Sequence, residues 1–163
     1  MFLSTAFYRV GLCFGMQCAW FAMFDARSVV LYLIARYRRV VGKGITRTRL
    51  MKLLFLVDYI HWKRCGRKLT NLEWRTYLFG PFSREVLDIL DELEDGGKVI
   101  VEEIEKGVYL YKAYEEPTNL SEAVKSLVDE VVEKFGKLSL DELLNYVYSL
   151  NEVKRTGIGE VIL

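Results

Sequence analysis

The residue types that most often catalyse reactions or bind metals are scarce in this chain. His61 is the only histidine, and Cys65 follows it by four residues, so a helix would place both side chains on one face. Cys13 and Cys18 complete a set of four candidate zinc ligands. The two pairs are far apart in the sequence, unlike the compact ligand pattern of structural zinc sites. We therefore expect a packed or half-exposed His61 and no metal site.

Two further patterns favour structure over chemistry. Gly42-Lys43-Gly44 lacks the spacing of a phosphate-binding loop and is typical of the end of a helix. The acidic run between residues 88 and 95 resembles a cation site in composition, but on a helix most of its members lie opposite the leucines, as a solvated face does. With one histidine, no usable cysteine pair and no phosphate loop, the sequence predicts a protein that is not an enzyme and has no cofactor.

Charge is divided unevenly along a chain of ordinary globular composition. The 163 residues are 52% apolar and 28% charged, with a net charge of +1, which indicates one domain with a hydrophobic core. Residues 25–82 contain 13 Lys or Arg and 3 Asp or Glu, whereas residues 83–163 contain 9 and 19. This asymmetry indicates either a basic binding face or two halves that pack together and neutralise each other; we favour the second.

The cysteine and amide contents bear on the environment of the protein. Three cysteines cannot form a disulfide framework, and an odd number argues against secretion. We therefore expect a cytoplasmic protein. Gln17 is the only glutamine, while Glu and Lys are abundant, a bias that is typical of thermophilic proteins.

The first 23 residues differ in composition from the rest. They hold two of the three cysteines and one charge, Arg9. A signal peptide would have an earlier basic residue and a better cleavage site, and a transmembrane helix would need a longer apolar run than residues 11–24, which Gln17 interrupts. We favour a start codon assigned too early, with Met16 or Met23 as the true start, and expect no membrane association unless residues 1–23 are genuine.

Apolar periodicity and capping signals predict a mainly α fold of the α+β class. We expect a compact bundle of about five helices with one small β-hairpin, in a domain that spans residues 25–152 and is followed by a loose tail at 153–163. The stretch 69–82 reads as irregular or short-helical. The first, third and fifth expected helices cover residues 27–41, 83–95 and 139–150. The second begins at Thr46 or Thr48 and ends at 65, the fourth begins at Asn119 or Ser121 and ends at 135, and the hairpin strands cover 99–103 and 108–112.

The order helix–helix–helix–hairpin also suggests a winged helix that binds DNA. A dense basic cluster in the first half could contact several phosphates. Against this reading, the helix after Ser83 and the hairpin are both acidic, whereas a winged helix concentrates positive charge on those elements. The candidate nucleic-acid contacts are Arg36, Arg38, Arg39, Lys43, Arg47 and Arg49.

Three motifs make the chain resemble the Panacea (SocA-like) antitoxin domain family as a divergent member. Lys52-Leu53-Leu54-Phe55-Leu56 fits the family's Lys-Leu-aromatic-Leu helix, and Phe79-Gly80-Pro81-Phe82, ahead of Ser83, fits its aromatic-Gly-Pro segment. Phe135-Gly136-Lys137-Leu138-Ser139 with Glu142-Leu143 resembles the start of its C-terminal helix. The resemblance spans residues 27–152. Where the family often has His and Trp after that Glu-Leu pair, this chain has Tyr146-Val147-Tyr148.

The resemblance implies a helical, non-catalytic module that neutralises a toxin by direct contact, with a toxin encoded nearby as the partner. Aromatic residues make effective interface anchors, so the aromatic residues around the Gly-Pro segment are the candidate partner-binding set. For Trp74 and Phe79 individually we favour core packing, because large aromatic residues are mostly buried. Gly80-Pro81 reads as a turn that positions Ser83 to cap its helix. The candidate partner-binding residues are Trp62, Trp74, Tyr77, Phe79 and Phe82.

Overall fold

The computed structural model describes residues 24–163, so the apolar segment 1–23, with the predictions about it, lies outside the described residues. The first helix, α1 (Ala26–Val41), begins where Asp25 accepts a hydrogen bond from the backbone N–H of Arg27. It ends at Gly42, whose φ of 83° is the left-handed conformation that suits glycine. Both ends agree with the sequence prediction.

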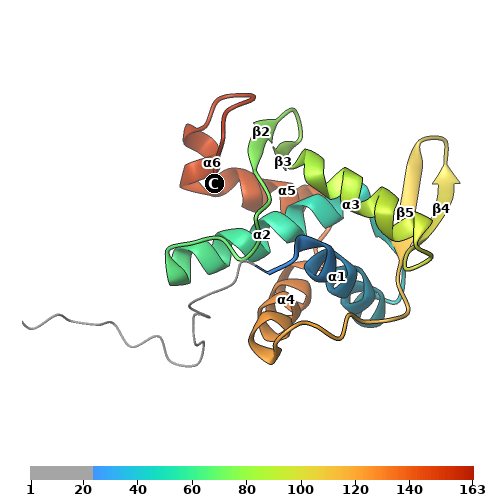
Figure 1. Ribbon diagram of the computed structural model, residues 1–163. Helices are drawn as coiled ribbons and strands as arrows, with labels where there is room; N and C mark the ends of the chain where they lie inside the picture. Colours follow the sequence, from blue (N-terminus) through green and yellow to red (C-terminus); the bar gives the residue numbers. More distant parts are fainter. Residues whose placement is uncertain (1–23) are drawn as a thin grey trace, which may run out of the picture.

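The second helix, α2 (Arg47–Cys65), lies at the centre of the molecule (Figure 1). Around it are α1, α4 (Glu122–Phe135) and a hairpin of β2 (Arg75–Tyr77) and β3 (Gly80–Phe82). An unbroken run of its residues from 50 to 59 is buried, which is the pattern of a helix covered on most of its circumference. Gly66 ends it in the left-handed conformation. The helix therefore carries the main core of the domain.

A three-stranded antiparallel sheet lies at one side of the molecule in the order β1–β5–β4 (Figure 1). Its strands β4 (Ile100–Glu105) and β5 (Val108–Lys112) form the predicted hairpin. The sequence reading missed β1 (Ile45–Thr46), where Ile45 pairs with Tyr111. The residue before β1 is Gly44, and a larger residue would not fit there, because its Cβ would lie 3.0 Å from the Cβ of Leu110.

The prediction of an irregular or short-helical stretch at 69–82 is wrong in part, because this stretch contains a second antiparallel hairpin. Its strands are β2 (Arg75–Tyr77) and β3 (Gly80–Phe82), joined by Leu78 and Phe79. Gly80 has a φ of 83°, a conformation that side chains other than glycine adopt at a cost. The chain thus reverses sharply and projects the two joining residues away from the helices.

The remaining helices of the described chain are α3 (Arg84–Asp95), α4 (Glu122–Phe135), α5 (Leu140–Ser149) and α6 (Asn151–Arg155). Ser139 and Glu142 form the predicted capping box of α5. Residues 24–163 thus contain one helix more than expected, and the tail is not loose. Its backbone pairs with β2, since the N–H of Ile162 donates to the carbonyl of Trp74 at 2.7 Å and that of Thr76 to Glu160 at 3.0 Å.

These elements make a mainly helical α+β fold, as the sequence predicts. Within residues 24–163, no helix is both long enough and apolar enough to cross a membrane.

Candidate functional site

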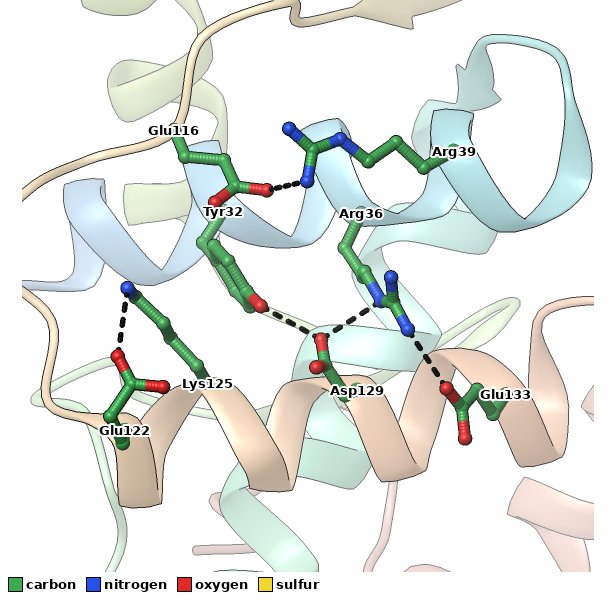
Figure 2. A network of polar contacts seen from close by, with 8 residues as sticks. All are labelled: Tyr32, Arg36, Arg39, Glu116, Glu122, Lys125, Asp129 and Glu133. Carbon is green, nitrogen blue, oxygen red and sulfur yellow. Dashed lines mark hydrogen bonds and ion pairs between the residues drawn. The ribbon is translucent and has the colours of Figure 1, made fainter.

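The oppositely charged halves of the chain meet where α1 packs against α4. Arg36 on α1 lies 3.0 Å from Asp129 and 2.8 Å from Glu133, both on α4 (Figure 2). The hydroxyl of Tyr32 donates to the same Asp129 at 2.9 Å, and burial together with this carboxylate raises the pKa of Tyr32 above its ordinary value. The basic first half and the acidic second half are thus joined by ion pairs across the α1–α4 contact.

Most of the predicted nucleic-acid contacts are already occupied within the chain. Arg39 pairs with Glu116 at 2.5 Å, as Figure 2 also shows. The guanidinium of Arg38 lies over the ring of Tyr114, and Arg49 donates to the carbonyl of Leu138 at 2.6 Å. Together with Arg36, whose partners lie on α4, four of the six predicted residues have intramolecular partners. Within residues 24–163, the side chains of Lys43 and Arg47 make no hydrogen bond, ion pair or ring contact.

The predicted aromatic set divides between core and surface. Trp74 is fully buried, and its indole Nε1 donates to Asp58 at 2.7 Å, so it cannot contact a partner in the folded state. Trp62 is partly buried on α2, beneath the Lys63 ammonium. The structure therefore does not bring Trp62 and Trp74 together with the remaining aromatic residues at the β2–β3 hairpin.

The tip of the β2–β3 hairpin carries three consecutive exposed apolar residues. Tyr77, Leu78 and Phe79 are 54%, 66% and 69% exposed. Tyr148 on α5 lies beneath the tip, where its hydroxyl donates to the carbonyl of Leu78 at 3.3 Å, and Gly80 approaches its ring. Sequence reasoning missed Leu78, which is not aromatic, and Tyr148, which is distant in the sequence and reaches the tip only through the fold.

A pocket of about 340 Å³ opens beside this tip. Its floor comes from the first turns of α2, its wall from the hairpin, and Leu87 of α3 closes one side. The rings of Tyr77 and Phe82 stack in a tilted pair with their centroids 5.6 Å apart. The lining residues are Arg47, Thr48, Met51, Lys52, Tyr77, Phe79, Gly80, Phe82 and Leu87.

Lys52 is the unusual member of the lining, because a lysine is almost never fully buried without an ion-pair partner. It is only 3% exposed, and its Nζ donates to the carbonyl of Pro81 at 2.9 Å. Burial lowers its pKa to about 8. Leu53 is buried in the core. The motif residues Lys52 and Pro81 are thus joined directly, and this contact fixes β3 on α2.

Ser83 occupies the N-cap position of α3, as predicted, but makes a different bond. Its hydroxyl donates to the Glu85 carboxylate at 2.6 Å, and no backbone amide of α3 donates to it. The Gly-Pro turn therefore delivers Ser83 to the start of α3 without a side-chain cap of the expected kind.

The Nδ1 atom of His61 lies 2.7 Å from the carbonyl oxygen of Arg67, just beyond the end of α2. Among residues 24–163, no group of three His, Cys, Asp or Glu side chains is arranged to hold a metal ion.

Comparison with known proteins gives a family match. The family model described as "Antitoxin SocA-like, Panacea domain" matches residues 50–152, which include Lys52, the β2–β3 hairpin and α5. No curated protein and no solved structure matches the chain.

Proposed function

The chain belongs to the family of SocA-like Panacea antitoxin domains, and we propose that it is a non-catalytic module that neutralises a toxin by binding it directly. Family membership supports a role in a toxin–antitoxin system. The direct contact, and the absence of catalysis, are the parts that this proposal adds.

The observation that carries the proposal is the exposed apolar tip of the β2–β3 hairpin. Leu78 and Phe79 project from the fold with about two-thirds of their surface exposed. Large apolar residues that protrude together on a surface mark interaction sites more often than scattered ones do. Aromatic anchors supply much of the binding energy of protein interfaces. We therefore place the partner contact at this tip and the pocket beside it.

Co-expression tests this function. The product of the adjacent gene is expressed alone and together with the full chain, and growth is measured. We expect growth arrest by the neighbour alone, rescue by the chain, and elution of both proteins as one complex in size-exclusion chromatography. A harmless neighbour that does not form a complex with the chain contradicts the proposal.

Two matched substitutions locate the contact. Phe79→Asp is expected to abolish rescue, because it places a charge in an apolar interface, while the circular dichroism of the chain stays unchanged. Ile100→Asp, at a residue 55% exposed on β4, introduces the same charge away from the tip and should leave rescue intact. Equal behaviour of the two variants would remove the hairpin from the interface.

A further inference from the structure

The pocket beside the hairpin contains two cationic side chains and no acidic one. Arg47 and Lys52, together with the hydroxyl-bearing Thr48, line it among apolar and aromatic residues, and none of its nine lining residues is Asp or Glu. Residues 47, 48, 51 and 52 recur at helical spacing and therefore share one face of α2. The pocket thus combines hydrogen-bond donors on its floor with an apolar wall.

The donors of this pocket are poorly satisfied by the chain itself. An ammonium group has three N–H donors, and within residues 24–163 the only acceptor for Lys52 is the Pro81 carbonyl. A buried cation without a counter-ion costs free energy, and binding an anion would relieve that cost. Arg47 is exposed and makes no side-chain hydrogen bond or ion pair in the described part of the chain. Charge complementarity therefore points to an anionic group that enters between the two.

The surroundings indicate that the anion belongs to an extended chain segment. A second hollow of about 110 Å³ shares Arg47 and Thr48 with the pocket and continues to Val108 and Tyr109 on β5. On the other side, the pocket reaches the exposed tip at Phe79. A segment that passes through can bury apolar side chains at both ends and its acidic group in the middle. A chain terminus would use only one side.

From this arrangement we infer that the pocket binds an extended segment of the partner protein, with an Asp or Glu side chain placed between Lys52 and Arg47 and apolar side chains beside it. The inference rests on the proposed function, because it assigns the chemistry that the partner presents to this surface.

Two blocked pentapeptides test the inference on the full chain. Both are acetylated and amidated and have the sequence Ser-Phe-X-Leu-Ser, with X either Glu or Gln. Titration into ¹⁵N-labelled protein should shift the amides of Thr48 and Gly80, with the Glu peptide binding about fivefold or more tightly than the Gln peptide, as a charge-assisted hydrogen bond predicts. The preference should shrink in high salt, because Arg47 is exposed.

Substitutions at the pocket complete the test. Arg47→Met changes an exposed side chain that makes no hydrogen bond or ion pair within residues 24–163, so the fold should persist. It should reduce the Glu-peptide preference about two- to fivefold, within the range of an exposed ion pair. Its matched control is Arg155→Met, also exposed, which should change nothing. Lys52→Met should remove the preference. Because that substitution also releases Pro81, the Arg47 variant is the decisive one.

Three results would overturn the inference: equal affinity for the two peptides, no shift at the pocket, or the same shifts from inorganic phosphate alone at equal affinity. The last result would indicate a simple anion site. Rescue from the toxin is scored separately. If rescue persists while the carboxylate preference is absent, the protein-binding function stands and only the assignment of the pocket fails. If rescue is absent while the peptide preference is intact, the assignment of the pocket stands and the proposed function fails.

Discussion

Asp58, in the middle of α2, accepts a hydrogen bond of 2.7 Å from the indole Nε1 of Trp74, just before β2. The same carboxylate accepts bonds from the backbone N–H and the hydroxyl of Thr70, at 2.8 and 2.6 Å. Asp58 is fully buried. One buried carboxylate thus anchors the segment between α2 and the hairpin, and so positions the surface that we propose to bind the partner.

We expect Asp58→Ala to lower the free energy of unfolding by about 3 kcal/mol, because it leaves three buried donors without an acceptor. Urea unfolding followed by circular dichroism measures the change. The matched control Asp88→Ala removes an exposed carboxylate from α3 and should cost no more than about 0.5 kcal/mol. A loss at Asp58 as small as that of the control would show that the network does not anchor the segment.

The C-terminal tail is the second support of the hairpin. The backbone of the tail pairs with β2. In addition, the guanidinium of Arg75 donates to the carbonyl of Gly159 in the tail at 2.9 Å. Deleting residues 157–163 should lower the free energy of unfolding by about 2–4 kcal/mol, as expected for several lost hydrogen bonds. Hydrogen exchange at the amide of Thr76, which donates to Glu160, should accelerate most. Unchanged protection there would contradict this support.

The helices were predictable because their signals are local. Gly42 and Gly66 end α1 and α2, and the Ser139 capping box begins α5, each through bonds to residues within a few positions. The two short strands of the second hairpin were not predictable. They are three residues long, Pro81 lies in one of them, and their stability comes from the distant tail and from Lys52.

The candidate site was predictable only in part, for the same reason. Its motif residues and three of its aromatic residues stand out in the sequence, but nothing in the local pattern shows that the motif residue Lys52 is buried. Its burial depends on the hairpin that covers it. Trp74 and Phe79 are similar in sequence context, yet one is buried and the other exposed. Tertiary contacts, which no local pattern encodes, separate them.

Glu152 of α6 gives a prediction about acid stability. It accepts bonds from Lys63 and Tyr59 of α2 at 2.6 and 2.7 Å, and chiefly the Lys63 bond lowers its pKa from 4.5 to about 2. A pKa that is lower in the folded state stabilises the protein above the unfolded pKa, and this stabilisation is lost as the pH falls from about 4.5 towards 2.

We therefore expect Glu152→Gln to cost at most about 1 kcal/mol at pH 7, allowing for solvent screening of a partly exposed pair. The gap between the variant and the natural protein should close by about pH 2. Urea unfolding at a series of pH values measures it. Glu105→Gln, on exposed β4, is the control. A gap that is constant with pH would contradict the role of the Glu152 carboxylate.

The last prediction concerns the basic first half of the chain. Arg36, Arg38, Arg39 and Arg49 are held by acidic, aromatic or carbonyl partners, so contact with a phosphate would first break those bonds. We expect no mobility shift of a random DNA duplex at low salt, where phosphate contacts are strongest. Asp129→Asn weakens the partner of Arg36 and serves as the comparison. A shift that appears only in this variant would show that the α1–α4 ion pairs withhold the basic face. A salt-dependent shift in the natural protein would instead restore DNA binding as a function of this chain.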